Sequence, residues 1–280
     1  MRRDFVRRRP SDAPSRRHPV LRLHSHVTGP ALSLASMNRA PRLCLTGDDA
    51  QAQAVVLLLH GGMPDSFAPV HLYDPSVLRL IPFGRSVFRA GGGRITLASL
   101  RYSVRGWNDG WESPLADARW ALDRIVDRFG HLPIGLVGHS LGGRVALRVA
   151  DHECIPGDVR SDVPAGGGPG GGTSGRGAHG VVRSVAALAP WLPDGEPIPP
   201  MGDRAVLLAH GSADHTTDPA RTAQLAKKLA LDGGDVELVT YPGARHAMLF
   251  PSRPWHDLVA GFMLRTLLAP EAEGHTGRQR

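Results

Sequence analysis

The sequence predicts an α/β protein with a doubly wound, mostly parallel sheet. Short apolar runs recur along the chain from residue 42, and they lack the polar-apolar alternation of a half-buried strand. Amphipathic helical patterns separate these runs. Strands that alternate with helices form parallel sheets with right-handed crossovers and helices on both faces. We therefore expect one α/β domain over residues 42–268.

Continuous apolar segments mark the expected strands in chain order. The run "AVVLLLH" is typical of a central strand that is buried on both faces. The preceding "RLCLT", at 42–46, predicts an antiparallel edge strand. The parallel strands are expected at 54–60, 94–102, 132–138, 184–190, 204–211 and 236–243.

Two segments between these strands carry helix start and stop signals. In the first, at 113–129, Ser113 is expected to cap a helix whose first position is a proline and whose apolar residues form one stripe. In the second, at 218–234, Asp218 is the expected cap and is again followed by a proline. Gly233 stands where that helix should end.

Three segments outside this regular pattern are predicted to be disordered or flexible. Residues 1–41 have the Arg, Pro, Ser and His bias of a disordered extension, and Met37 is hypothesised as an alternative start of the chain. Residues 156–180 predict a Gly-rich flexible surface insertion, and the absence of a following P-loop lysine argues against phosphate binding there. Residues 269–280 predict a disordered tail.

Positive charge is concentrated in the N-terminal extension. The formal charge of the whole chain is +7, and ten Arg against two Asp give +8 over residues 1–42, so the remainder carries −1. A nearly neutral domain lacks the basic surface that binds nucleic acid. We therefore expect no nucleic-acid partner, with DNA retention through the arginine-rich extension as the alternative.

Hydropathy and cysteine content predict a cytoplasmic protein with no membrane partner. The longest strongly apolar run, residues 54–59, is far shorter than the roughly 18 residues of a membrane-spanning helix. Cys44 and Cys154 are too few for a disulfide framework and have no metal-ligand spacing. We accordingly expect no metal and no cofactor, and the sequence does not indicate an oligomeric state.

The segment "LVGHSLGGR" surrounds one serine with glycines. It satisfies the pattern G-x-S-x-G through Gly138, Ser140 and Gly142. A strand that ends before Ser140 and a helix that begins after it must be joined by a tight turn, which exposes the hydroxyl at the carboxyl end of the sheet. The helix N-terminus also supplies the Leu141 N–H, which suits a developing oxyanion. Ser140 is therefore the candidate nucleophile.

These features resemble the α/β-hydrolase family, in which the "GHSLGG" form of the motif is common. The resemblance covers nearly all of residues 42–268 through the order of the elements. The segment "LLLHGGM" at 57–63 is similar to the oxyanion segment of the family. The resemblance implies that Gly62, or alternatively Met63, is the second oxyanion donor beside Leu141.

Two further motifs resemble the acid and histidine loops of the family. "AHGSAD" implies Asp214 as the acid and "YPGARHAM" implies His246 as the base, in the chain order that this fold uses. Asp218 is the rival acid, although an aspartate directly before a proline is better explained as a helix cap. His246 would take the proton of Ser140, and Asp214 would fix the imidazole tautomer.

The resemblance narrows to members without a lid, because residues 191–203 are too few for a separate lid domain. Small serine esterases, dienelactone hydrolase relatives and prolyl-oligopeptidase-like enzymes have this form. They imply hydrolysis of a small-molecule carboxylic ester with a small or medium acyl chain, with Phe67, Trp107 and Trp191 as candidate substrate-binding residues. A thioesterase, acyltransferase, peptidase or perhydrolase on the same triad, or a non-catalytic binding protein, are the alternatives.

The remaining polar residues beside the motifs are expected to have less direct roles. His60, His139 and His210 each neighbour a motif and are expected to be structural. Arg144 is expected on a solvated helix face. Arg105 follows the carboxyl end of a predicted strand, and it is a candidate for lining the site or for loop packing.

Overall fold

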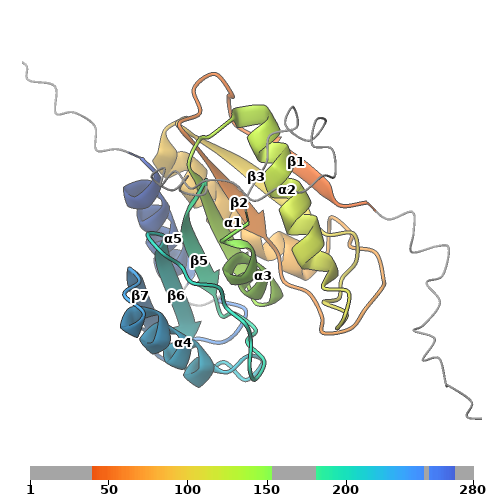
Figure 1. Ribbon diagram of the computed structural model, residues 1–280, viewed down its shortest axis with the longest axis vertical. Helices are drawn as coiled ribbons and strands as arrows, with labels where there is room; N and C mark the ends of the chain where they lie inside the picture. The colour runs from red at the N-terminus through yellow and green to blue at the C-terminus, as the bar shows by residue number, and fades with distance from the viewer. Residues whose placement is uncertain (1–39, 153–180, 249–251, 269–280) are drawn as a thin grey trace, which may run out of the picture. The chain divides into compact units, whose positions relative to one another are not determined.

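The structure is a computed structural model that describes residues 40–152, 181–248 and 252–268 (Figure 1). The predicted insertion at 156–180 and the predicted tail at 269–280 lie outside these residues, as does all but the last two residues of the predicted extension. Within the described part of the chain, no helix combines the length and the apolar character needed to cross a membrane.

Seven strands form one sheet with a single antiparallel edge strand. Their order across the sheet is β1-β3-β2-β4-β5-β6-β7, and every neighbouring pair except β1 and β3 is parallel. Each predicted strand is present, including the antiparallel edge. The bounds are β1 (Arg42–Thr46), β2 (Ala54–Leu59), β3 (Ile95–Arg101), β4 (Ile134–His139), β5 (Val182–Leu188), β6 (Ala205–Gly211) and β7 (Val236–Tyr241).

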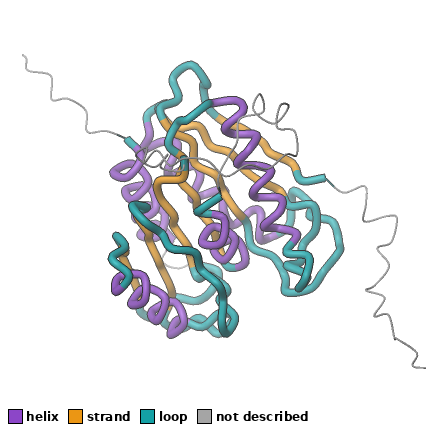
Figure 2. The backbone as a smooth tube through the Cα atoms, viewed as in Figure 1, coloured by secondary structure: helices purple, strands orange, loops and turns teal. Residues whose placement is uncertain are grey.

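Helices cover both faces of the sheet, as the alternation of elements predicts (Figure 2). Apolar side chains of α2, α3 and α4 pack against one face, and those of α1 and α5 pack against the other. The central strands β2 and β4 are buried along their whole length, because each of their faces meets a helical layer. The helices are α1 (Pro75–Gly91), α2 (Ser113–Phe129), α3 (Leu141–Val149), α4 (Pro219–Leu231) and α5 (Ser252–Leu267).

The helix ends confirm one predicted cap and correct the other. Asp218 Oδ1 accepts the Ala220 N–H at 2.8 Å, and Gly233 just beyond α4 has a φ of 83°. At α2 the prediction is wrong, because Ser113 is the first helical residue and Glu112 occupies the cap position with a φ of 45°. The turn before α2 already binds the Glu112 N–H, so the helical geometry begins one residue earlier than the sequence signal.

Candidate active site

Ser140 lies in a strained turn between β4 and α3. Its φ of 56° is a left-handed value that residues other than glycine rarely adopt. A Cβ on Gly138 would collide with the backbone of Gly142, and a Cβ on Gly142 would collide with the Leu59 carbonyl. The glycines of the motif therefore allow β4 and α3 to approach closely. They leave Ser140 half-buried at the carboxyl end of the sheet.

The segment after β2 runs beside this turn and offers the candidate oxyanion donors. A Cβ placed on Gly62 would lie 3.1 Å from a side-chain carbon of Leu141, the residue that follows Ser140. The Met63 N–H already donates to the Arg105 carbonyl at 2.9 Å. For the N–H groups of Gly62 and Leu141, no hydrogen bond is found to any described residue. These two are therefore better placed than Met63 to bind an oxyanion.

Asp214 and His246 form a hydrogen bond at the carboxyl ends of β6 and β7. The distance from Asp214 Oδ2 to His246 Nδ1 is 2.7 Å, and the Asp214 side chain is fully buried. Asp214 Oδ1 accepts the N–H groups of Thr216 at 2.7 Å and Thr217 at 3.1 Å. Burial raises the pKa of Asp214, but the bonds from His246, Thr217 and Thr216 outweigh it and lower this pKa to about 2. The ionised carboxylate therefore keeps the proton of His246 on Nδ1.

His139 connects the serine turn to the histidine loop. Its Nε2 donates to the His246 carbonyl at 2.9 Å, and the centroids of the two rings are 4.8 Å apart. Burial, with a smaller effect of His246, lowers the pKa of His139 to about 3, so the ring is neutral at physiological pH. Because His139 directly precedes Ser140, this bond brings His246 to the same part of the sheet edge as Ser140. The contact agrees with the structural role expected for His139.

The other two histidines beside the motifs hold loops in place. His60 Nε2 accepts the Tyr102 N–H at 3.3 Å, and its Nδ1 donates to the Gly61 carbonyl at 2.6 Å. His210 Nε2 lies 3.1 Å from Asp214 Oδ2. Burial lowers the pKa of both rings, in His60 to about 4. Within the described part of the chain, no group of three metal-binding side chains is arranged to hold an ion.

A small cavity of about 110 Å³ opens beside Ser140. Trp191 forms part of its wall, and its role in substrate binding stays a prediction. Phe67 is 42 % exposed and is not among the lining residues. The prediction for Trp107 is wrong, because this side chain is 1 % exposed and packs in the core beneath the site. The residues that line the cavity are Gly62, Met63, Pro64, Ser140, Leu141, Trp191, Thr216 and Thr217.

Arg144 is buried rather than solvated, which corrects the sequence-based expectation. Its side chain is 7 % exposed and pairs with Glu196 Oε2 at 2.7 Å. The guanidinium carbon lies 3.6 Å from the ring centroid of Trp107 and 4.7 Å from that of Trp191. Both indoles therefore take part in cation–π contacts with one arginine. These partners lie far from Arg144 in the sequence, so helical periodicity could not reveal them.

Arg105 is held in its own loop, outside the lining of the cavity beside Ser140. Its guanidinium pairs with Asp74 Oδ1 at 2.8 Å, and its Nε donates to the Pro69 carbonyl at 2.9 Å. Its carbonyl accepts the Met63 N–H, as described above. Of the two roles considered for Arg105, the contacts therefore favour loop packing, which steadies the candidate oxyanion segment.

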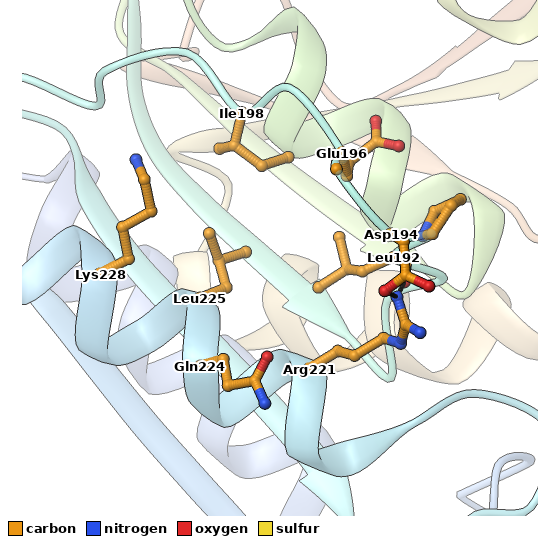
Figure 3. A pocket seen from close by; sticks show the side chains of 10 residues that line it. Leu192, Asp194, Glu196, Ile198, Arg221, Gln224, Leu225 and Lys228 are labelled. Carbon is orange, nitrogen blue, oxygen red and sulfur yellow. Dashed lines mark hydrogen bonds and ion pairs between the residues drawn. The ribbon is translucent and has the colours of Figure 1, made fainter.

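A second pocket, of about 260 Å³, lies between α4 and the loop that follows Trp191 (Figure 3). Figure 3 shows Arg221 of α4 reaching toward Asp194 of the loop, with Leu225 and Ile198 on the two sides of the pocket. Arg221 Nη1 lies 2.5 Å from the Asp194 carboxylate. No sequence pattern indicates this pocket, because the Pro-rich loop has no periodicity.

The sheet order and the position of the candidate site define an α/β-hydrolase fold without a separate lid domain. Several solved structures are similar to this fold. A lidless serine hydrolase from Xanthomonas campestris gives a TM-score of 0.51 at 16 % identity, covering 82 % of this chain and 90 % of that one. An esterase from Thermogutta terrifontis with propionate bound gives 0.53 at 18 % identity, covering 80 % and 89 %. Est1E from Butyrivibrio proteoclasticus with ferulic acid bound gives 0.52 at 14 % identity, covering 82 % and 96 %.

Sequence comparison adds a family match over part of the chain. The model of the prolyl oligopeptidase family matches residues 198–268, which contain the acid loop, α4, the histidine loop and α5. Among curated proteins, none matches this sequence. The chain therefore has the α/β-hydrolase fold, which is the fold that the resemblance implies.

Proposed function

We propose that the protein is a serine hydrolase that cleaves carboxylic esters with small or medium acyl chains. The observation that carries this proposal is the 2.7 Å hydrogen bond between the buried Asp214 carboxylate and His246, whose carbonyl is bound by His139, the residue before Ser140. The esterases among the similar structures support hydrolase chemistry on this fold. A neutral ring with a proton on Nδ1 leaves Nε2 as the acceptor that a serine nucleophile requires.

In this mechanism Ser140 attacks the ester carbonyl while His246 Nε2 takes the hydroxyl proton. Asp214 stabilises the imidazolium that forms, and its low pKa keeps it ionised while it does so. The N–H groups of Gly62 and Leu141 bind the tetrahedral oxyanion. His246 then protonates the leaving alcohol, and water attacks the acyl-enzyme with the same residue as base, which releases the acid and restores Ser140.

The expected acyl size follows from the dimensions of the cavity beside Ser140. Its volume of about 110 Å³ is small compared with the roughly 300–1,000 Å³ of pockets for drug-sized ligands. Trp191 forms part of the wall, and the half-exposed Met63 stands at the rim. We therefore expect acetate to butyrate esters to fit the acyl side, with the alcohol directed to solvent.

Replacement of Ser140 by Ala should lower the turnover of p-nitrophenyl esters by about 10⁶, because the rest of the triad cannot act without its nucleophile. The measurement is a panel of acetate to dodecanoate esters, together with labelling of the folded protein by a fluorophosphonate probe. Ser252→Ala, which alters a serine at the start of α5, is the matched control and should retain both activity and labelling. Ester cleavage that is unchanged in S140A would refute the proposed function.

Peptide hydrolysis is the second candidate reaction, and the prolyl oligopeptidase family match favours it specifically. A p-nitroanilide of a prolyl dipeptide and a p-nitrophenyl ester of the same acyl group distinguish the two. We expect the wild-type protein to cleave the ester and to leave the anilide intact.

We propose a cytoplasmic location from the two cysteines of the sequence, and fractionation of the native host tests it.

A further inference from the structure

A larger and more apolar cavity lies on the α1 side of the sheet, away from Ser140. Its volume is about 380 Å³, and it shares no lining residue with the cavity beside Ser140. Leu58 of β2 and three side chains of α1, Val77, Leu80 and Ile81, supply much of its apolar wall. Ile81 is 40 % exposed, so part of this apolar surface meets solvent.

Two arginines stand at the rim of this cavity and face each other across the edge pair of strands. Arg42 of β1 is paired directly with Arg101 of β3. Like charges in directly opposite positions destabilise a strand pair. No carboxylate among the described residues forms an ion pair with either guanidinium. A bound anion between the two arginines would relieve this repulsion.

We propose that this cavity binds an alkyl chain with an anionic head group, of the class of a medium-chain carboxylate. The head group would lie between Arg42 and Arg101, and the chain would cover the apolar wall formed by β2 and α1. The volume falls in the usual range for small-ligand sites, roughly 300–1,000 Å³. The proposal does not depend on the reaction at Ser140, because the two cavities are separate.

Apart from Cys44, the other polar side chains in the wall are Ser99 and His60, and neither carries a charge that could replace the arginines. The His60 ring lines the cavity, but both of its nitrogens are occupied by the Tyr102 N–H and the Gly61 carbonyl. Burial and the nearby Arg101 keep this ring uncharged at neutral pH. His60 therefore presents an apolar ring surface to a ligand, and the charge at the rim decides the head group.

Cys44 provides a direct test, because this free, exposed thiol also lines the cavity. In the full-length Cys154→Ser variant, Cys44 is the sole cysteine. We expect decanoate to slow alkylation of Cys44 by iodoacetamide at least fivefold, and to do so equally after Ser140 has been blocked by a fluorophosphonate. Decanol at the same free concentration should protect much less, and decylphosphate should protect at least as well as decanoate, because the arginines bind the negative charge.

Variants then identify the groups that hold the head group. Arg42→Gln and Arg101→Gln should each weaken the protection by decanoate about three- to tenfold. The ratio of alkylation rates with and without decanoate is compared, since this ratio cancels any direct effect of the arginine on the thiol. Arg253→Gln, at a highly exposed position in α5, is the control and should leave the ratio unchanged.

Three results would overturn the proposal. Absence of protection by decanoate would show that no alkyl anion binds there. Equal protection by decanol would show an apolar groove without an anion site. A Cys44 that resists iodoacetamide in the full-length protein before any ligand is added would show that another part of the chain already covers the cavity.

Discussion

Ser140 occupies a backbone conformation that typically costs about 1–3 kcal/mol, and its neighbours hold it there. Its N–H donates to the Leu188 carbonyl at 2.9 Å, and its own carbonyl accepts the Trp191 N–H at 3.0 Å. Leu188 is the last residue of β5, and Trp191 lies in the loop that follows this strand. These bonds hold the serine backbone on both sides of its Cα, so the direction of its Cα–Cβ bond is set before a substrate arrives.

Substitution of Asp214 by Asn tests the acid at the same scale. The amide cannot stabilise an imidazolium, and its NH₂ group favours the wrong histidine tautomer, so kcat should fall by about 10⁴. Asp218→Asn is a matched control four residues away, because this side chain caps α4 and lies outside the proposed triad. The D218N protein should keep its kcat. Comparable losses in the two variants would contradict the assignment of Asp214.

Helix α3 connects the turn of Ser140 to two tryptophans, Trp107 in the core and Trp191 in the cavity wall. Arg144 and Arg148 are one turn apart on this helix, and both pair with Glu196 of the loop that follows Trp191, at 2.7 and 3.0 Å. The Glu196 side chain is 5 % exposed, so each pair is largely shielded from water. Arg144 alone lies over both indoles at less than 5 Å. The loop that borders the cavity is therefore tied to the helix that follows Ser140.

Replacement of Arg144 by Leu should reduce the free energy of unfolding by about 2–4 kcal/mol. Both indoles lose their cation and Glu196 loses one of its two arginines, while the pair with Arg148 remains. Since Trp191 lines the cavity, KM for a butyrate ester should rise more than KM for an acetate ester. Arg148→Leu removes the other bond to Glu196 and leaves Arg144 in place, so the ratio of the two KM values should stay near that of the wild type. Urea unfolding and the ester panel measure both effects. Equal shifts of the ratio would assign the effect to Glu196 instead of the stacked arginine.

Over the whole molecule, local patterns predicted what depends on neighbours in sequence. Continuous hydrophobicity located the six parallel strands, and "RLCLT" indicated the edge strand β1. Short motifs located Ser140, Asp214 and His246 at or after the carboxyl ends of β4, β6 and β7. Helices α1 and α5 were not predicted; in α1, Pro82 and Gly84 interrupt the pattern and lower the intrinsic helix propensity. The burial of Trp107, and the apolar cavity with its arginine pair, depend on strand order and on side chains that are distant in sequence. No sequence window contains this information.

Buried neutral histidines predict that acid destabilises the folded molecule well above the pKa of its carboxylates. The pKa values of His60 and His139 are lowered from 6.5 to about 4 and about 3, so the unfolded chain binds more protons than the folded one below pH 6.5. The free energy of unfolding should therefore fall as the pH drops from 6.5 toward 4, by on the order of 3 kcal/mol for His60 alone. Asp214, with its pKa lowered to about 2, loses its own contribution to stability only below about pH 4, so it does not affect this interval.

Urea midpoints at pH 7.5, 6 and 5 measure how steeply the free energy of unfolding depends on pH. His139→Gln, which keeps a donor near Nε2, should flatten this dependence, whereas Gln at the exposed His131 should not. An equal slope in the wild type and H139Q would mean that the charged form of His139 is accommodated in the fold.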